Sequence, residues 1–368
     1  DKDELEFRDV TFRVGDKVSS FEKDTVVLES GKKVEAGAVV MAIGVTPETE
    51  LAVKAGLELG VTGAIKVDQN YRTSNPDIYA VGDAIEVYNA LTGKMMKLPL
   101  AGPAQKQARE AADHMHGMLV KNTGYIGSSV IKCFDYNGAS TGLTEGMIKA
   151  LNLDINYKVV KVIPGDKVGL MPGCEPLHFK LLFEIPTGKI LGAQAIGRGN
   201  VDKRVDIIAT AIKFNAKIDD LRDLELCYAP PFGTAKDVVN FAGYVGSNLL
   251  RGAFKQVSES DVRDLVQSGA FIIDVREKDE YELSHIKGAL NIPLSELRER
   301  VNEIPKDKPV YLHCRSAQRS YNAVMALQHL GFTNVYNVSG GFMGISFYEY
   351  FNDQTTGREK IVTDYNFL

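Results

Sequence analysis

The chain has 368 residues, of which 44% are hydrophobic and 25% are charged, and a formal net charge of −5 at pH 7. The length predicts two or three domains, and the composition is that of a globular protein. The excess of negative charge argues against non-specific nucleic-acid binding, and no apolar run approaches the ~18 residues that span a bilayer. We therefore expect neither a nucleic-acid nor a membrane partner.

Residues 1–46 are predicted to form short strands separated by turns. The strands lie at residues 5–14, 18–22, 25–28 and 39–43. The last of them is a continuous apolar run that ends at Gly44, which is typical of a buried strand. A meander of this kind has no phosphate-binding loop of its own, and an independent domain seldom begins this way. We therefore expect residues 1–46 to be the remnant of a larger domain, and the chain to be part of a longer protein.

The next two parts differ in how they mix strands and helices. Residues 47–122 hold apolar strands at 65–67 and 78–81, followed by a helix at 104–119. In residues 123–245 strands and helices are interspersed, which is an α+β pattern. Its strands are predicted at 129–134, 157–163, 178–184 and 190–195, and its helices at 142–151 and 204–214.

The last part is predicted to be a small α/β domain. A linker that contains Gly and Ser, residues 246–256, leads to the domain at 257–352, and residues 353–368 form a C-terminal tail. Strands alternate with helical segments between linker and tail, which favours a parallel sheet. These strands are expected at 271–275, 309–313 and 334–338. The whole chain is thus predicted to be a multidomain α/β and α+β protein.

The cysteines and histidines are scattered along the chain. No two of the four cysteines form a Cys-x-x-Cys pair, and the six histidines show no metal-ligand spacing. Neither a zinc site nor a disulfide framework is indicated, and no signal-peptide pattern opens the sequence. We therefore expect no metal and a reducing, cytoplasmic setting.

Cys314 ends an apolar strand and opens a short loop that leads into a helix. The flanking Arg315 and Arg319, the N–H groups of the loop and the helix dipole favour negative charge at its sulfur. Such surroundings stabilise a thiolate or a persulfide anion. An inert buried thiol is the alternative, and two arginines beside the sulfur argue against it.

The segments around Cys314 follow a characteristic order. Asp274-Val275-Arg276 ends a strand, residues 280–293 come next, and Gly340-Gly341 follows the Cys314 loop. Together they resemble a rhodanese sulfurtransferase domain over residues 257–352. The resemblance implies that Cys314 carries a persulfide sulfur held by the backbone amides of residues 315–319. It also implies the roles of the loop residues: Arg315 and Arg319 are catalytic together with Cys314, and Ser316, Ala317 and Gln318 form the persulfide cradle. Arg319 would close the loop by pairing with Asp274.

Cysteine-dependent phosphatases offer a competing interpretation, because they also hold a thiolate in an anion-binding loop. Phosphatases place five residues between cysteine and arginine, which makes room for a tetrahedral phosphate. Only four residues separate Cys314 from Arg319. The narrower loop suits a single sulfur atom better.

A second signal lies at residues 73–83, which end in Gly82-Asp83. Gly82 permits close approach of a ligand to the backbone, and the Asp83 carboxylate can accept hydrogen bonds from hydroxyl groups. The segment resembles the second FAD motif of the pyridine nucleotide-disulfide oxidoreductases, in which the matching aspartate binds the ribityl chain of the flavin. Residues 42–47 resemble the family's marker between its NAD(P)H- and FAD-binding regions. Residues 100–105, with Ala101, resemble the helix start that approaches the flavin ring.

Residues 125–245 resemble the dimerisation domain of the same family, in particular of its coenzyme A-disulfide reductase branch and the rhodanese-fused persulfide reductases. Residues 139–145 and 227–232 carry this likeness. The resemblance implies a homodimer in which Tyr228 reaches towards the flavin and the reactive cysteine of the partner. A buried interface tyrosine with a satisfied hydroxyl is the alternative for Tyr228.

The sequence departs from this family at two points. No Gly-x-Gly-x-x-Gly follows a strand, so neither phosphate loop and no redox cysteine of the family is found, and Cys133, Cys174 and Cys227 are interpreted as structural. Leu170-Met171 stands where the family usually has a tyrosine pair, and Cys174 just after it has no explanation.

The leading hypothesis is a reductase fused to a sulfurtransferase. FAD and NAD(P)H would serve the reduction of coenzyme A disulfide, persulfide or polysulfide, and Cys314 would transfer sulfur. Lys203, Arg204 and Lys236 are candidate contacts for the coenzyme A phosphates, and solvated surface charge is equally compatible with each. Two alternatives remain: a sulfurtransferase on a dimerisation scaffold without reductase activity, and a redox sensor that holds a stable Cys314 persulfide.

Overall fold

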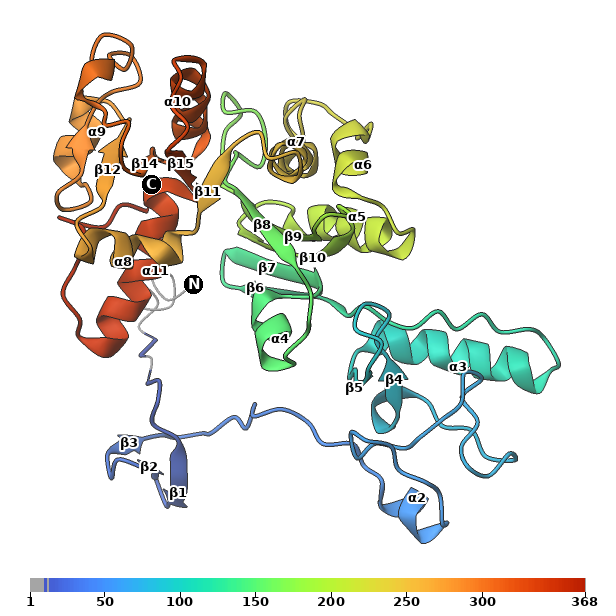
Figure 1. The fold of residues 1–368 in the computed structure, drawn as a ribbon. Coiled ribbons are helices and arrows are strands. Elements are labelled where there is room, and N and C mark those ends of the chain that lie inside the picture. Colours follow the sequence, from blue (N-terminus) through green and yellow to red (C-terminus); the bar gives the residue numbers. More distant parts are fainter. Residues whose placement is uncertain (1–9, 12, 368) are drawn as a thin grey trace. The chain divides into compact units, whose positions relative to one another are not determined.

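The computed structural model of the chain describes residues 10, 11 and 13–367. These residues belong to two compact units, one of residues 13–127 and one that holds residues 128–367 together with residues 10 and 11. Figure 1 shows the elements of both units, coloured along the sequence. Among the described residues, no helix has the length and apolar character needed to cross a membrane.

The unit of residues 13–127 begins with a small antiparallel sheet. Its strands are β1 (Val18–Glu22), β2 (Thr25–Leu28) and β3 (Lys33–Glu35), in that order. Val26 and Leu28 are its buried side chains. The predicted strands at 18–22 and 25–28 are therefore confirmed, and the one at 5–14 lies mostly outside the described residues.

The buried strand predicted at residues 39–43 is wrong. These residues form no strand, and the exposed fractions of Val40 and Ile43 are 88% and 85%. An apolar run becomes a strand only when neighbouring strands satisfy its N–H and C=O groups. Among the described residues no strand pairs with this run.

The rest of this unit packs around one apolar cluster, which includes Ile65, Tyr71, Ile85 and Tyr125. Its elements are α2 (Glu50–Lys54), the 3-10 turn η1 (Gly82–Ala84), β4 (Glu86–Tyr88), β5 (Met95–Lys97) and α3 (Ala101–Met115). The strand predicted at 78–81 is reduced to a single bridge between Tyr79 and Arg72. The predicted helix is confirmed, and it begins three residues earlier than expected.

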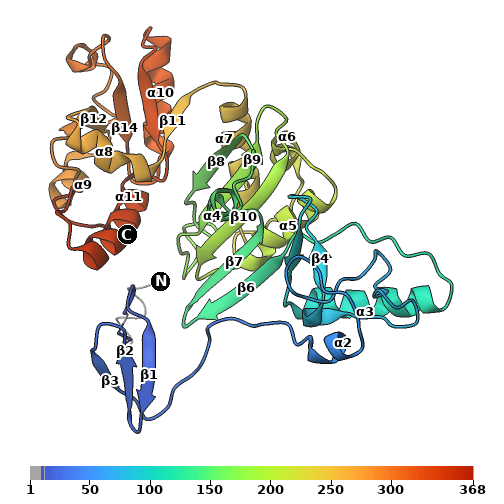
Figure 2. The same cartoon turned by 60° about the horizontal axis from the view of Figure 1, so that its bottom comes forward.

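The second unit contains a five-stranded antiparallel sheet with strand order β6-β7-β10-β9-β8. Helices α5 and α7 pack against one face of it, as Figures 1 and 2 show. The strands are β6 (Ser128–Cys133), β7 (Tyr136–Gly142), β8 (Tyr157–Val162), β9 (His178–Glu184) and β10 (Ile190–Gly197). The helices are α4 (Glu145–Ala150), α5 (Val201–Lys213), α6 (Ile218–Asp223) and α7 (Val238–Leu250). This is the α+β arrangement predicted for residues 123–245.

The second unit also contains a parallel five-stranded sheet with strand order β11-β15-β14-β12-β13. The strands are β11 (Lys255–Val257), β12 (Phe271–Asp274), β13 (Leu290–Asn291), β14 (Val310–His313) and β15 (Val335–Val338). The helices are α8 (Val262–Gln267), α9 (Lys278–Leu283), α10 (Gln318–His329) and α11 (Gly341–Thr356), with 3-10 turns η2 (Glu259–Asp261) and η3 (Val301–Glu303). The predicted parallel sheet is thus confirmed.

The expected linker at 246–256 is corrected by the structure. Residues up to Leu250 continue helix α7, and residues from Lys255 already form β11. Gly246 is buried because its backbone packs against Ile218, and the Ser247 hydroxyl donates to Asp219. Gly246 and Ser247 therefore allow close packing of helix α7, although a linker was predicted at these residues.

The expected C-terminal tail is also corrected. Helix α11 extends to Thr356, and Ile361 and Val362 belong to the apolar core of the parallel-sheet domain. Val362 pairs with Ile286 in an isolated bridge. Two adjacent buried apolar side chains explain why this segment packs rather than trails into solvent.

Candidate functional site

Cys314 lies at the carboxyl end of β14, between that strand and helix α10. Its side chain is almost completely buried, with an exposed fraction of 1%. The loop turns sharply because Ala317, the residue before α10, adopts a left-handed conformation with φ of 72°. L-residues rarely adopt this conformation, so the turn is held by its surroundings. Helix α10 begins at Gln318, four residues after Cys314, and its N-terminus has no side-chain cap.

The first residues of α11 hold the Cys314 loop through backbone hydrogen bonds. Phe342 N–H donates to the Cys314 carbonyl (2.7 Å), and Met343 N–H donates to the Arg315 carbonyl (3.0 Å). Gly341 has φ of 59°, and a Cβ atom there would lie 2.6 Å from the Cys314 carbonyl oxygen. Only glycine fits this approach of two backbone segments, which explains the Gly340-Gly341 pair in the sequence.

Ser320 and Asn337 are two functional candidates that the sequence analysis missed. The Ser320 hydroxyl oxygen lies 3.6 Å from Cys314 Sγ and 2.7 Å from Asn337 Oδ1. Asn337 also donates from Nδ2 to the Ala317 carbonyl (3.3 Å). A hydroxyl carries one proton, so Ser320 can donate either to the sulfur or to the amide. The available signal was a serine in the first turn of the helix that follows the cysteine loop.

The predicted pairing of Arg319 with Asp274 is wrong. Both terminal nitrogens of Arg319 donate to Glu280 of α9, at 2.6 and 2.7 Å. The fully buried Asp274 is instead paired with Arg276, whose Nε and Nη2 donate to it at 3.0 and 2.6 Å. The partner of Asp274 is thus Arg276, two residues further along the chain. Arg319 lies in the first turn of α10, where it reaches the Glu280 carboxylate on α9.

These two pairs set the charges around the loop. The hydrogen bond from Arg319 lowers the pKa of Glu280, so the carboxylate stays ionised at neutral pH. Burial would raise the pKa of Asp274, but the hydrogen bonds and the charge of Arg276 outweigh it and the pKa is lowered. Burial also lowers the pKa of His313, which lies 3.6 Å from Asp274, so its ring is neutral at neutral pH. Asp274 is thus held by Arg276, and not by Arg319.

A cavity of about 190 Å³ lies beside the Cys314 loop. Arg315, directly after the cysteine, forms part of its wall, as do Phe342 and Met343. The remaining lining residues are Arg276, Glu280, Leu283 and Asn366. The wall combines two guanidinium groups and one carboxylate with apolar side chains, so it can accommodate a small anion and an attached organic group.

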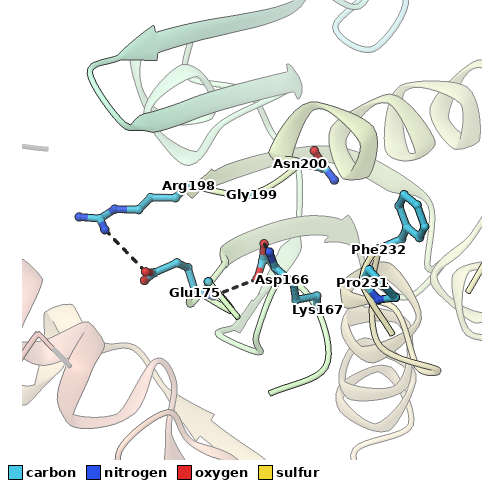
Figure 3. Close-up of a pocket in the computed structure, with 9 residues that line it drawn as sticks. Asp166, Lys167, Glu175, Arg198, Gly199, Asn200, Pro231 and Phe232 are labelled. Atoms are coloured by element: carbon cyan, nitrogen blue, oxygen red, sulfur yellow. Dashed lines mark hydrogen bonds and ion pairs between the residues drawn. The ribbon is translucent and has the colours of Figure 1, made fainter. Parts of the chain in front are cut away.

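A second, polar cavity of about 270 Å³ lies in the antiparallel-sheet domain (Figure 3). The loop that carries Asp166 and Glu175, the end of β10 at Arg198, and Pro231 and Phe232 surround it. Figure 3 shows Arg198 turned towards Glu175, and the two side chains form an ion pair in the wall of this cavity.

The predicted contacts for coenzyme A lie in different surroundings. Arg204 is buried and pairs with Asp237 at 3.1 Å, so its charge is used inside the protein and we withdraw it as a coenzyme A contact. Lys203 is half-buried on α5. Lys236 is exposed, with its ammonium group 5.2 Å from the Tyr244 ring. Arg204 is one of the buried residues of α5, the helix that packs against β7 and β10.

Leu170, Tyr228 and the three cysteines that the sequence analysis interprets as structural are exposed or half-buried. The exposed fractions of Leu170 and Tyr228 are 94% and 50%, and Cys227 is exposed as well. Cys174 is half-buried, and its thiol donates to the Lys167 carbonyl (3.3 Å). Cys133 is half-buried at the end of β6. The structure thus leaves Tyr228 accessible, as a group that reaches another chain has to be.

The flavin-side candidates lie together in the unit of residues 13–127. Gly82 adopts φ of 78°, and its N–H donates to the Gln107 side chain of α3 (2.6 Å). Asp83 is exposed beside it in the turn η1, which packs against α3. Helix α3 begins at Ala101, and Leu100 before it provides no side-chain cap. An exposed carboxylate close to uncapped helix N–H groups fits the ribityl and ring atoms of a flavin.

Comparison with known families divides the chain into three matched parts. The model of pyridine nucleotide-disulphide oxidoreductases matches residues 2–108, and that of the dimerisation domain of these enzymes matches residues 128–238. The rhodanese-like domain model matches residues 258–347.

Individual relatives agree with these matches. The coenzyme A disulfide reductase of Staphylococcus epidermidis is 33% identical over 243 residues, which are 66% of this chain and 55% of that protein. A solved structure described as reduced Bacillus anthracis CoADR-RHD is 44% identical, with a TM-score of 0.92 over 95% of this chain and 63% of that one. The NAD-dependent persulfide reductase from A. fulgidus is 34% identical, with a TM-score of 0.83 over 93% and 62%.

The chain thus spans a little over half the length of the curated relatives and under two thirds of the solved ones. The solved relatives match it across both the oxidoreductase segments and the Cys314 domain. The chain therefore belongs to the pyridine nucleotide-disulphide oxidoreductase family and carries a rhodanese-like domain after the dimerisation domain.

Proposed function

We propose that this chain provides the sulfur-transfer step of a FAD- and NAD(P)H-dependent enzyme that reduces coenzyme A disulfide, persulfide or polysulfide. The observation that carries the proposal is the enclosure of Cys314 by a tight loop, with Arg319 held by Glu280 and the Ser320 hydroxyl near the sulfur. The similarity to a coenzyme A disulfide reductase and to a persulfide reductase supports the reductive half.

The sulfur step at Cys314 is an exchange between two sulfur–sulfur bonds. The Cys314 thiolate attacks the outer sulfur of a donor R–S–S⁻, a new S–S bond forms at Sγ, and the donor bond breaks. The donor sulfur R–S⁻ leaves with the electron pair, so charge balances and no external oxidant or reductant is needed. Transfer of the outer sulfur to an acceptor such as cyanide then regenerates the Cys314 thiolate.

The residues around the sulfur have separate tasks in this step. The amides of residues 315–319 and the start of α10 would stabilise the charge of the thiolate and of the persulfide. The Arg319–Glu280 pair would hold the arginine at the rim of the loop. Ser320 would donate a hydrogen bond to the sulfur when the charge increases there, and it would give up the bond that it otherwise donates to Asn337. Asp274 would act only through Arg276.

The flavin would be held in part by the other unit of the chain. We propose that Asp83 accepts hydrogen bonds from its ribityl hydroxyls, that Gly82 gives it room, and that the α3 N–H groups near Ala101 face its ring. Bound FAD would carry electrons from NAD(P)H to the sulfur substrate. In a homodimer Tyr228 would reach the partner's reaction centre, and Lys203 and Lys236 would meet the coenzyme A phosphates.

The experiment that tests this proposal uses Cys314→Ser with Cys227→Ser as its control. Cys227 is an exposed thiol, whereas Cys314 is buried in its loop. We expect Cys314→Ser to reduce thiocyanate formation from thiosulfate and cyanide below about one thousandth of the wild-type rate, since the nucleophile is lost. Cys227→Ser should retain the wild-type rate. Transfer that persists in Cys314→Ser would contradict the proposal.

A second candidate function is a sulfurtransferase on a dimerisation scaffold, without reductase activity. One observation favours it: among the described residues, those that line the cavity beside Cys314 come from the parallel-sheet domain and its C-terminal segment. A measurement of NAD(P)H oxidation, with coenzyme A disulfide or persulfide as the oxidant, separates the two candidates. The scaffold predicts no oxidation above the rate without substrate.

A further inference from the structure

The C-terminal segment, residues 357–367, is attached to the Cys314 domain by buried ionic contacts. Arg358 donates from Nε to Asp353 (2.6 Å) and from Nη2 to Glu349 (2.9 Å), and both carboxylates lie almost fully buried on α11. The Tyr365 hydroxyl donates to the other oxygen of Asp353 (2.6 Å). Hydrogen bonds to buried charged groups are stronger than neutral ones, so this segment has a defined path.

Apolar and backbone contacts continue this attachment up to the site. Val362 is fully buried and pairs with Ile286, and Thr363 N–H donates to the His285 carbonyl (2.9 Å). The carbonyl of the preceding residue, Ser284, accepts a hydrogen bond from Arg276 Nη2 (2.6 Å). The C-terminal segment therefore supports the loop that holds one guanidinium of the cavity beside Cys314.

The segment also supplies one wall residue of that cavity, Asn366. Its backbone N–H donates to the hydroxyl oxygen of the fully buried Ser346 (3.1 Å), which fixes its position. Its neighbour Tyr365 packs edge-on against Tyr350, with ring centres 5.1 Å apart. Asn366 lies beyond residue 347, where the match to the rhodanese-like family ends, so the family model gives it no role.

The size of the cavity limits what can enter it. Its volume of about 190 Å³ is that of about six water molecules, and it is below the ~300 Å³ at which pockets for whole drug-sized ligands begin. A small anion, or the thiol end of a longer molecule, fits this volume. Coenzyme A as a whole does not.

The chemistry of the wall distinguishes between these occupants. Leu283, Phe342 and Met343 offer apolar contact to methylene groups, and Arg315 offers positive charge. The Asn366 side chain carries both a donor and an acceptor, which is the pairing that a peptide-like amide needs. Thiosulfate has oxygen acceptors but neither methylene groups nor an amide donor.

We propose that Asn366 contacts the sulfur donor in the cavity beside Cys314 and favours organic persulfides with an amide-bearing chain over thiosulfate. The inference rests on the proposed sulfur transfer at Cys314 and adds a residue that selects the donor. Asn366 is a specificity residue in this scheme, because the bonds that form and break are those of the donor and of Cys314.

The test compares two donors, N-acetylcysteine persulfide and thiosulfate, with cyanide as acceptor. In Asn366→Ala we expect kcat/KM for the persulfide to fall about fivefold to tenfold, the effect of one lost hydrogen bond, mainly through a higher KM. For thiosulfate the change should stay below about twofold, because it has no amide group to pair with Asn366 and Arg315 meets its negative charge. The control is Asp364→Asn, two residues earlier on the same segment, whose exposed side chain does not line the cavity.

Two results would overturn the inference. One is an unchanged ratio of the two kcat/KM values in Asn366→Ala, with or without an equal loss for both donors, and the other is an Asp364→Asn ratio that shifts like that of Asn366→Ala. Asn366→Leu, which has a neutral side chain of similar size but no amide, should shift the ratio in the same direction and guards against misfolding of the alanine variant. Wild-type protein that transfers no sulfur from either donor would instead refute the proposed function.

Discussion

Two apolar runs of this chain end in different surroundings. Val310–His313 forms β14, lies between β12 and β15, and leads into the Cys314 loop. Residues 39–43 are just as apolar but are exposed, and no described strand pairs with them. The difference shows that hydropathy alone does not make a strand, because the backbone groups of a buried strand need neighbours on both sides. Of these two runs, β14 is the one that leads into an enclosed site.

The largest expected effect comes from the closest backbone contact of the Cys314 site. In Gly341→Ala the new Cβ would meet three backbone atoms of the loop at 2.6 to 2.7 Å, in a conformation with φ of 59°. We expect a loss of about 4 kcal/mol of unfolding free energy or more, and sulfur transfer reduced at least about 100-fold. Urea unfolding and thiocyanate formation measure the two effects.

Gly357→Ala is the matched control for this variant. Gly357 ends the same helix with φ of 65°, but a Cβ there meets nothing within 4 Å. Its cost should therefore be the conformational one alone, about 1 kcal/mol, with sulfur transfer retained. Equal losses in the two variants would mean that contact with the loop is not what makes Gly341 necessary.

The next effect compares the two apolar runs directly. Leu312 in β14 is fully buried, and Leu312→Ala should cost about 3 kcal/mol because it leaves a cavity. Val40 is exposed, and Val40→Ala should change the unfolding free energy by less than about 0.5 kcal/mol. Chemical denaturation of both variants provides the test. A cost at Val40 close to that at Leu312 would show that residues 39–43 are buried in solution.

The smallest effect concerns the ion pair at the rim of the loop. Glu280→Gln removes the charge that Arg319 contacts, and we expect a loss of about 1 kcal/mol for this partly exposed pair. Because the folded-state pKa of Glu280 is lowered, the ion pair makes its full contribution to the unfolding free energy at pH values above the normal glutamate pKa. The contribution disappears as the pH falls through the lowered value.

The pH dependence of this difference is the measurement. The unfolding free energy of wild type minus that of Glu280→Gln should be constant from neutral pH to about pH 5 and shrink at lower pH. Glu282→Gln, on the same helix with an exposed side chain, is the control and should show no such difference. A difference that grows on acidification would contradict the assigned pair.

The sequence was informative where one short segment carries the whole pattern. The Cys314 loop, the parallel sheet around it and helix α3 follow from local periodicity and from residues adjacent in the chain. Ala317 and Gly341 contribute to the same loop through their own backbone conformations, and the glycine pair was visible as a motif. Local patterns of this kind need no knowledge of distant partners.

The sequence was less informative wherever a choice between partners decides the structure. Arg319 had two carboxylates to choose from, and only the placement of α9 shows that Glu280 is the nearer. Residues 246–250 continue helix α7, and Gly246 packs closely against Ile218 of α6. From composition alone, a glycine at this position predicted a flexible linker. Asn366 lies 52 positions after Cys314 along the sequence, and no spacing rule connects them.

The central claim is that the buried Cys314, and not a more accessible thiol, carries the transferred sulfur. Mass spectrometry of peptides from the protein treated with thiosulfate tests this directly, because the chain also offers the exposed Cys227. We predict one added sulfur atom on the peptide that contains Cys314 and none on the peptides with Cys133, Cys174 or Cys227. Sulfur found on Cys227, with Cys314 unmodified, would contradict the account.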